Sequence, residues 1–359
     1  MTQMIRAFIL CCLWLYSTLF AAWWTLHLLT GDTLWWMALL TSFTPILFLP
    51  LLLFWPLGIG VRHPTYWPAL LLPTLVFLYL YGVLFIPRSI SAYQRDPPPL
   101  RLMTFNIWGG SHRAKSANVL LEQNLPDVVT LQELTPMMQR LLLKTVGSAY
   151  PYYAFDAAAG HGGLGVLSRY PLERITSDLL IDLSCRQYRV TVDATHHFRL
   201  YNCHPESTNL RHLASTWSTL IQQTQDTFRL RTLLAQRLVQ EIQAHDEPTI
   251  VMGDFNTTDQ SDAYQALRRA LSDAQRAAGW GFGHTYPSGP GRFRHIPILP
   301  RQLRIDMILY SRDFVALQSA VGTTHGESDH LPFTAMLGWR QAPEKPATKQ
   351  NSKEAIGAP

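Results

Sequence analysis

Charged residues are nearly absent from the first quarter of the chain. The 359 residues include 30 Lys and Arg and 25 Asp and Glu, but those before Pro87 are only Arg6, Asp32 and Arg62. A segment so poor in charge does not resemble the surface of a soluble domain. It contains three uncharged apolar stretches, at residues 7–29, 34–55 and 66–86. Each is close to the roughly 20 residues that cross a bilayer as a helix. We therefore predict a membrane region, residues 1–87, with three transmembrane helices.

The residues in and around these stretches bear on whether they cross a membrane and in which orientation. Tryptophans lie near the ends of the stretches, as is common in membrane-spanning helices. The first stretch alone could be a cleaved signal peptide, but it is long and two more follow it. Arg6 and Arg62 favour a cytoplasmic amino terminus, because the loop around Asp32 has no Lys or Arg. After three crossings the remainder would be extracytoplasmic, although Arg88 and Arg95 favour the opposite orientation.

Cysteine is scarce, and two common catalytic motifs are missing. Of four cysteines, Cys11 and Cys12 lie in the first apolar stretch, and no Cys-x-x-Cys metal motif is present. Cys185 and Cys203 could form a disulfide in an oxidising compartment or remain two thiols. Neither a phosphate-binding loop ending in Gly-Lys-Ser/Thr nor a His-Glu-x-x-His motif occurs, so nucleoside triphosphatases and zinc proteases have no support. The net charge of +5 suits an anionic membrane surface or a phosphorylated substrate.

Beyond the apolar region the sequence predicts a stiff Pro-containing connector at 88–99, a catalytic domain at 100–339 and a disordered tail at 340–359. Strand-like runs in the domain are LRLMTFNI, DVVTLQE, GLGVLSR, YRVTVDA, FRLYNCH, PTIVMGD and RIDMILY. Helix-like stretches separate several of them. One begins at Thr135 and Pro136, and another carries an apolar stripe from Phe228 to Ile242 that Leu230, Leu233 and Val239 would widen. The mixture indicates an α+β fold with sheets inside and helices outside.

Polar residues gather where apolar runs end. In VMGDFN, a strand continuing through Gly253 would point Asp254 and Asn256 the same way. Further examples, each at or near the end of an apolar run, are Asn106, Glu133, His204, Asp306, Asp329 and His330. Any one alone is more often structural, since Asn and Asp favour turns and caps. The recurrence of the pattern favours a shared catalytic site. Other histidines, including His161, have no motif context and are expected at the surface.

Phosphoester chemistry accounts for these residue types. Mg²⁺ takes oxygen ligands and keeps several waters, so carboxylates plus an amide suffice, and Glu133 and Asn106 suit that role. Asp306 is the expected partner that orients His330, because a catalytic histidine needs its second ring nitrogen held. Asp329 would point away from its neighbour His330 and is assigned to a metal or water. Donors for a phosphate are His204, Asn256 and His330.

These residues resemble the endonuclease/exonuclease/phosphatase superfamily, which includes apurinic endonucleases, DNase I-like nucleases, sphingomyelinases and inositol polyphosphate phosphatases. TFNI, LQE, GDFN, RIDMIL and SDHLPF follow in the family order between Leu100 and Leu337. The resemblance implies a four-layer α/β/β/α sandwich of two packed mixed sheets, and Mg²⁺, with Mn²⁺ as an alternative. It also implies metal positions and catalytic positions. The metal residues would be Asn106, Glu133 and Asp329. The catalytic residues would be His204, Asp254, Asn256, Asp306 and His330.

The segment CHPES, which contains His204, departs from the apurinic endonucleases and is similar to the sphingomyelinase and phosphoinositide-phosphatase branches. The layout of three spans before such a domain resembles bacterial membrane phosphatases associated with glycopeptide resistance. We therefore expect a membrane-anchored phosphohydrolase acting on a lipid-linked phosphate or pyrophosphate. The alternatives are an anchored nuclease acting on DNA or RNA and an inactive binding domain. A nuclease would require a long basic groove, whereas the sequence offers one short basic cluster, expected to be a solvated loop: Arg292, Arg294, His295, Arg301 and Arg304.

Overall fold

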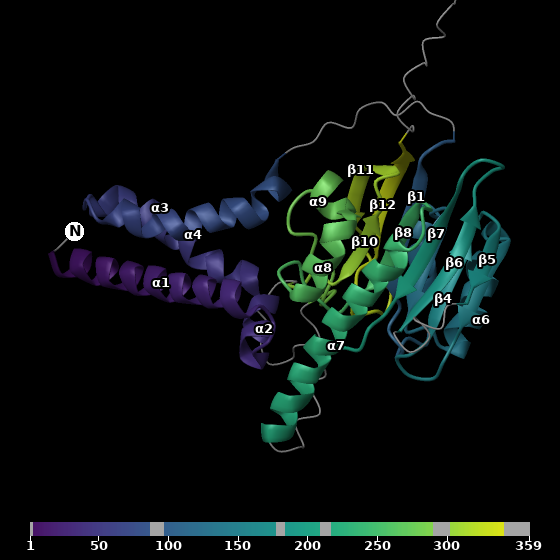
Figure 1. Ribbon diagram of the computed structural model, residues 1–359, viewed down its shortest axis with the longest axis horizontal. Helices are drawn as coiled ribbons and strands as arrows, with labels where there is room; N and C mark the ends of the chain where they lie inside the picture. Colours follow the sequence, from purple (N-terminus) through teal and green to yellow (C-terminus); the bar gives the residue numbers. More distant parts are fainter. Residues whose placement is uncertain (1–2, 87–96, 177–183, 209–216, 290–301, 341–359) are drawn as a thin grey trace, which may run out of the picture.

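A computed structural model of the chain describes residues 3–86, 97–176, 184–208, 217–289 and 302–340. Two six-stranded sheets form its carboxyl-terminal part (Figure 1). The first sheet, in spatial order, contains β11 (Phe314–Val321), β12 (Phe333–Trp339), β1 (Leu100–Asn106), β2 (Val128–Gln132), β4 (Leu164–Ser168) and β3 (Tyr152–Asp156). The second contains β5 (Leu172–Ile175), β6 (Cys185–Thr191), β7 (His197–Cys203), β8 (Thr249–Asp254), β10 (Asp306–Tyr310) and β9 (Ser272–Asp273).

Each sheet has one parallel pair at its centre. In the first sheet β1 runs parallel to β2, with Leu102 opposite Val128, and in the second β7 runs parallel to β8, with Leu200 opposite Ile250. The other strand pairs within both sheets are antiparallel. Parallel neighbours end at the same edge of a sheet, so the carboxyl ends of each central pair lie together. The residues that follow these ends are the ones that the sequence assigns to the site.

Apolar side chains fill three layers between the sheets and the helices. Leu102, Phe198 and Met252 belong to the buried core between the two sheets. The outer face of the first sheet packs against α5 (Lys115–Glu122) and α6 (Pro136–Val146). The outer face of the second packs against α7 (Trp217–Gln243) and α8 (Asp262–Ala270). The predicted α+β class and the α/β/β/α order of layers are therefore confirmed.

Local signals explain where the helices begin. Thr135 caps α6 by accepting a hydrogen bond from the Met138 N–H, and Pro136 occupies the first helical position, as predicted. The predicted stripe of α7 is buried at Phe228, Leu234, Leu238 and Ile242. The expectation that Leu230 and Leu233 widen this stripe is wrong, because their exposed fractions are 55% and 42%.

The amino-terminal region contains three helices long and apolar enough to cross a membrane. They are α1 (Gln3–Thr30), the segment Thr44–Val61 made of η1 (Thr44–Phe48) and α3 (Leu49–Val61), and the segment Tyr66–Phe85 made of α4 (Tyr66–Tyr81) and η2 (Gly82–Phe85). In Figure 1, α1, α3 and α4 lie side by side and extend away from one end of the sandwich. By length and composition these helices indicate membrane association.

The second span differs from its predicted range of 34–55. A separate short helix, α2 (Trp35–Ser42), takes the first part of that range, and the span begins at Thr44 and continues to Val61. Pro45 and Pro50 lie in the first turns of η1 and α3, where a missing N–H is tolerated. The break falls at Phe43, whose φ of −109° and ψ of 23° lie outside the helical region, so α2 ends at Ser42.

The sandwich packs directly against the ends of these helices. The Asp32 N–H donates to Asp262 Oδ2 at 2.9 Å, and the Asp262 N–H donates to Asp32 Oδ2 at 2.8 Å. On the other side of the bundle, Arg276 donates to the Leu80 carbonyl at 2.8 Å. These contacts bring the sandwich up to the ends of the candidate spans, although the sequence predicts a connector between the two parts. Most of the connector and the tail from 341 lie outside the described residues.

Candidate active site

The candidate site is built from the ends of the two central strand pairs. Asn106 ends β1 and Glu133 follows β2, whereas His204 follows β7 and Asp254 ends β8. Asp306 is the first residue of β10 and lies opposite Asp254 in the antiparallel register. His330 comes from the loop before β12. Residues up to 224 positions apart in the sequence therefore meet at one edge of the two sheets.

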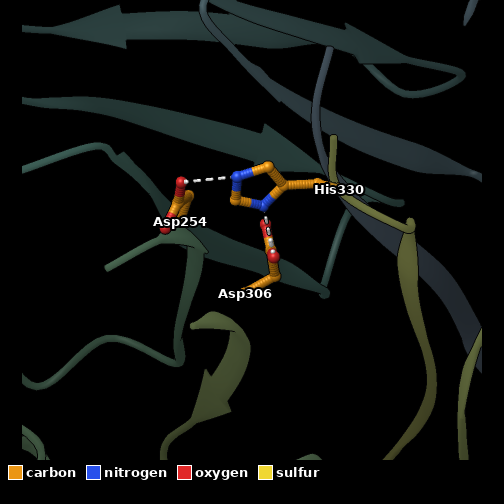
Figure 2. Close-up of side chains that lie close together, drawn as sticks. All are labelled: Asp254, Asp306 and His330. Atoms are coloured by element: carbon orange, nitrogen blue, oxygen red, sulfur yellow. Dashed lines mark hydrogen bonds and ion pairs between the residues drawn. The ribbon is translucent and has the colours of Figure 1, made fainter. Parts of the chain in front are cut away.

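Asp306 and His330 form a buried pair, as predicted. Asp306 Oδ2 lies 2.8 Å from His330 Nδ1, and the opposite ring nitrogen, Nε2, lies 3.6 Å from Asp254 Oδ2. Figure 2 shows the imidazole held between the two carboxylates, with Asp306 on one nitrogen and Asp254 facing the other. The Tyr286 ring packs against the same imidazole, with centroids 4.8 Å apart. The ring is thus fixed in orientation with Nε2 directed at Asp254.

The charge of His330 follows from its neighbours. Burial alone would lower the pKa of His330, but the carboxylates of Asp306 and Asp254 outweigh it and raise that pKa to about 10. Burial raises the pKa of the Asp306 carboxyl, although the adjacent His330 opposes that shift. At neutral pH the proton belongs on the imidazole, so His330 is a hydrogen-bond donor at Nε2.

Asn106 connects the two strand pairs. Its side-chain nitrogen donates to Glu133 Oε1 at 3.1 Å and to Asp254 Oδ2 at 2.9 Å. Its Oδ1 accepts from the Trp108 N–H at 2.9 Å. Asn106 is buried, so this amide fixes the distance between the first sheet and the second at the site.

Glu133 is held as a carboxylate by several donors. The Gly109 N–H donates to its Oε2 at 2.7 Å, and His161 Nδ1 lies 2.6 Å from the same oxygen. Burial would raise the pKa of Glu133, but the Gly109 N–H, His161, His204 and Asn106 together lower it below its usual value. Glu133 therefore remains ionised in the site.

His204 lies within reach of both acids. Its Nε2 is 3.9 Å from Glu133 Oε1 and 3.7 Å from Asp254 Oδ2. Its position is set by β7, by the hydrogen bond from its N–H to the Ser184 carbonyl and by the disulfide of the preceding residue, Cys203, with Cys185. The sequence left the pairing of these cysteines open, and the structure contains the bridge.

Asn256 lies beyond the end of β8, so strand alternation does not extend to it. β8 ends at Asp254, and Asn256 has a φ of 49°, in the left-handed region. Its N–H donates to Asp254 Oδ1 at 2.9 Å, and its side-chain nitrogen donates to the Pro205 carbonyl at 3.0 Å. Asn256 thus ties Asp254 to the segment that carries His204, and a second amide N–H is available for a phosphate.

Three residues of the candidate site have an uncommon backbone conformation. Trp108 and Glu133 have φ values of 68° and 56°, which, like that of Asn256, are uncommon for residues with a Cβ. Such conformations persist where surrounding contacts hold them, and they cluster at functional sites. The fact that three occur around one carboxylate cluster supports a functional role.

Asp329 is half-buried next to His330. Its charge helps to raise the pKa of His330, and its backbone carbonyl accepts from the Ser288 N–H at 2.6 Å. These contacts place it beside the site, and its assignment as a metal ligand stays a prediction.

Several contributors were not identified from sequence. His161 was expected to be a plain surface residue, and it contacts Glu133 although 72% of its side chain is exposed. Ser328 Oγ donates to the Asn106 carbonyl at 2.6 Å and accepts from the His330 N–H at 3.0 Å, which joins the His330 loop to β1. Beneath the site, Gln132 donates to Asn202 Oδ1 across the sheets at 2.8 Å. Ser328 lies in SDHLPF, two residues before His330, so the sequence motif could have identified it as part of the site.

The donor set suits a hard divalent cation. The carboxylates of Glu133 and Asp254 both accept from the side-chain amide of Asn106. A half-turn of that amide would present its Oδ1 to a cation in place of its nitrogen. Within the described part of the chain, no Lys or Arg forms an ion pair with either acid. One ligand atom each of Asp254, Asp306 and His330 also lies within 4.8 Å of the others. A cation among those three would have to replace the Asp306–His330 hydrogen bond, so Glu133 and Asn106 are the better ligands.

The basic cluster expected in a solvated loop is only partly described. Arg292, Arg294, His295 and Arg301 lie outside the described residues. Arg304 is 4% exposed, and its guanidinium lies 2.9 Å from Asp273. Arg304 is therefore a buried structural ion pair, and the expectation that it is solvated is wrong.

The sequence profile of the Endonuclease/Exonuclease/phosphatase family matches residues 103–330. This match covers more than half of the chain and includes every residue of the candidate site. The chain therefore belongs to this family, whose members are typically metal-dependent hydrolases of phosphoester bonds. No curated protein sequence matches the chain.

Several solved structures are similar to the chain. D. rerio TDP2, complexed with a single-strand DNA product, is 18% identical with a TM-score of 0.50, over 67% of this chain and 99% of that one. An endonuclease/exonuclease/phosphatase family protein of Bacteroides thetaiotaomicron is 18% identical with a TM-score of 0.49, over 69% and 100% of the two chains. The Neisseria 3′ phosphatase NExo, bound to a product DNA hairpin, is 19% identical with a TM-score of 0.49, over 67% and 100%. At these identities the likeness concerns the fold alone.

Proposed function

We propose that the chain is a membrane-anchored, Mg²⁺-dependent phosphohydrolase that cleaves a phosphoester or pyrophosphate bond of a lipid-linked substrate by attack of water. The observation that carries the proposal is the convergence on Asp254. Its Oδ2 lies 2.9 Å from Asn106, 3.7 Å from His204 and 3.6 Å from His330. An acid surrounded by an amide and two imidazoles is suited to hold a water beside a phosphate.

The residues divide into two roles. Glu133 and Asn106, with Asp329 as a further candidate, would hold Mg²⁺, which when bound neutralises phosphate charge and lowers the pKa of water. On the other side, Asp254 orients the attacking water and accepts its proton. His330 donates Nε2–H to a phosphate oxygen as negative charge develops there, and Asp306 keeps the ring in place. His204 and the second N–H of Asn256 are further donors to the phosphate.

The anchor favours a membrane substrate. An enzyme tethered in a bilayer meets lipid-linked molecules at high effective concentration. The amino end of α1 and the loop carrying Arg62 lie at the end of the helices away from the sandwich (Figure 1). With these arginines cytoplasmic, the catalytic domain would be extracytoplasmic. The Cys185–Cys203 disulfide supports that orientation, because disulfides persist in oxidising compartments.

The decisive experiment uses the detergent-purified full chain with Mg²⁺, lipid phosphates and pyrophosphates, and supercoiled plasmid. We expect phosphate release from the lipids, loss of activity with a chelator, and an intact plasmid. Asp254→Ala should lower kcat by roughly 10² to 10⁴-fold. Asp246→Ala is the matched control, since its side chain is fully exposed.

The outcomes separate the alternatives. Plasmid nicking with untouched lipids would make the chain an anchored nuclease. Full activity of Asp254→Ala, with circular dichroism unchanged, would refute the assignment of the site. The absence of turnover on both substrates at every metal tested would favour an inactive binding domain.

A further inference from the structure

Two tryptophans outside the candidate spans are unusually exposed. Trp217 and Trp280 have exposed fractions of 76% and 63%, the highest among the tryptophans of the described residues. Large apolar side chains left open to solvent commonly mark an interaction surface. Tryptophan in particular favours the headgroup region of a bilayer, because its ring is apolar and its N–H is polar.

Trp280 lies at the end of the third candidate span. Its ring packs edge-on against Phe85, with centroids 5.9 Å apart, and Phe85 is the last residue of that span. The next residue, Gly281, donates its N–H to the Leu84 carbonyl at 2.8 Å. Phe282 then contacts Tyr81 and Phe85, with centroids 5.2 and 5.3 Å apart. These contacts fix Trp280 at the level where the span leaves the membrane.

The first turns of α7 lie near the end of the first candidate span. Gln225 donates to the Thr33 carbonyl at 3.1 Å, three residues after α1 ends at Thr30. Trp217 lies eight residues before Gln225, or about 12 Å along the helix axis. In Figure 1 the amino end of α7 projects beyond the sandwich and is level with α2 along the long axis of the molecule. Trp217 therefore reaches the membrane side of the catalytic domain.

The composition of these turns suits a lipid surface. Residues 217–225, WSTLIQQTQ, contain no charge, and the first charged residue of α7 is Asp226. Trp217, Leu220 and Ile221 follow the spacing of one helical face, and the two aliphatic residues are half-buried. A helix with such a face and neutral polar neighbours lies in the plane of the membrane interface.

We propose that residues 217–225 of α7 and Trp280 form a headgroup face, which rests in the headgroup region of the bilayer that holds the three helices. The proposal depends on the membrane anchoring given under the proposed function. Its support is continuity, because Trp280 contacts Phe85 at the end of the third span and Gln225 contacts Thr33, three residues after the first span. The catalytic domain is then seated on the lipid surface at two points on opposite sides of the helices.

The headgroup face is connected to the active site. Arg231, six residues after Gln225 on α7, donates to the Glu206 carbonyl and to Thr208 Oγ1, each at 2.8 Å. Residues 204–208 carry His204 and also Pro205, whose carbonyl accepts from Asn256. A helix seated on lipid therefore supports the segment that delivers His204, so the face should matter more for bilayer substrates than for soluble ones.

The test places a fluorescent label on the headgroup face. In the full chain with Cys11→Ser and Cys12→Ser, the variants Trp217→Cys and Trp280→Cys are labelled with an environment-sensitive dye and reconstituted in phosphatidylcholine–phosphatidylglycerol vesicles. Some of the lipids carry a nitroxide at the headgroup end of the acyl chain. We expect a blue shift and quenching at both positions. Met137→Cys on α6 is the control, because Met137 is 46% exposed and α6 lies at the far end of the sandwich (Figure 1).

A fourth labelled position distinguishes failure of the headgroup face from failure of the proposed membrane anchoring. Leu28→Cys reports the first candidate span, where Leu28 is 66% exposed. Quenching at Leu28 without quenching at Trp217 and Trp280 would overturn the headgroup face and leave the anchor intact. No quenching at Leu28 would overturn both. As a second readout, Trp217→Ser with Trp280→Ser should raise KM for a lipid phosphate in vesicles and leave turnover of a soluble phosphodiester unchanged. Equal losses on both substrates would contradict the role in lipid contact.

Discussion

The Asp306–His330 pair sets the chemistry of the site at the level of single residues. The imidazole has no access to bulk water, and its pKa is raised by two carboxylates, so its proton remains in place through the neutral range. A protonated histidine cannot act as a base. The residue that accepts the proton of water in our proposal is therefore Asp254, and His330 supplies positive charge to the phosphate.

Replacement of Asp306 tests this division of roles. Asp306→Asn keeps the shape of the side chain but removes the charge that stabilises the imidazolium. We expect kcat to fall by roughly 10² to 10⁴-fold with a small change in KM, since the lost interaction acts on the transition state. Steady-state kinetics on the preferred substrate measure both constants, with Asp246→Asn as the exposed control. A loss confined to KM would argue against an orienting role for Asp306.

The sequence predicted most of these residues because they end apolar runs. It could not predict His161, which comes from a loop between two other strands and reaches Glu133 only in three dimensions. Strand alternation could not place Asn256, because alternation holds only while a strand continues, and β8 stops at Asp254. The left-handed conformations of Glu133 and Asn256 depend on the contacts around them, and no local sequence pattern predicted them.

At the scale of elements, the strands predicted from the sequence are mostly buried ones, although the buried strand β12 was not among them. The seven predicted strands correspond to observed ones with mostly buried residues. β3 and β5 lie at the edges of the sheets and are partly exposed, so they lack a long apolar run. The helices were easier to predict where a cap was present, as at Thr135. The buried stripe of α7 is narrower than the apolar pattern of the sequence predicted, because Leu230 and Leu233 face solvent.

The disulfide is the strongest local constraint on β6 and β7. Cys185 and Cys203 lie opposite each other in the antiparallel register and close a loop with a sequence separation of 18. Cys185→Ala with Cys203→Ala should lower the free energy of unfolding by about 3 kcal/mol, mainly because the unfolded chain gains freedom. Urea unfolding followed by near-ultraviolet circular dichroism measures this change.

The free cysteines provide the comparison. Cys11→Ser with Cys12→Ser should leave the urea midpoint unchanged, because neither residue is in the disulfide. If the Cys185 and Cys203 variant unfolded at the same urea concentration as the parent, the bridge would not be present in the purified protein.

At the scale of the whole molecule, the apolar amino-terminal helices and the two-sheet sandwich meet through specific contacts. The composition predicted an apolar region followed by a separate domain. It could not show that they touch, because Asp32 and Asp262 are 230 positions apart and each has an ordinary local context. Gly31 allows the close approach, since a Cβ there would lie 2.5 Å from the Asp262 carboxylate.

The Asp32 contact should make stability depend on pH. Burial, followed by the negative charge of Asp262, raises the pKa of Asp32 to about 7. The folded protein then holds a proton that the unfolded chain releases near pH 4, so stability is highest at low pH and falls as pH rises to about 7. Asp32→Asn removes this pH-dependent loss of stability. Its stability advantage should grow between about pH 4 and 7, by at most roughly 1.4 kcal/mol per pKa unit, and then stay constant.

Thermal unfolding of the detergent-purified protein, followed by circular dichroism at a series of pH values, measures the advantage. Asp226→Asn is a suitable control, because Asp226 is exposed on α7. An advantage of Asp32→Asn that is the same at pH 5 and pH 8 would show that Asp32 does not titrate in this range.

The order of strands has a consequence for how the site is divided. In each sheet, a parallel pair is flanked on both sides by antiparallel strands, and the ends of that pair deliver two of the site residues. The first sheet gives Asn106 and Glu133, and the second gives His204 and Asp254. The catalytic domain therefore consists of two topologically equivalent halves without visible sequence repetition. In our proposal, cation binding belongs to the first sheet and water activation to the second, so either sheet could change in evolution while the other kept its chemistry.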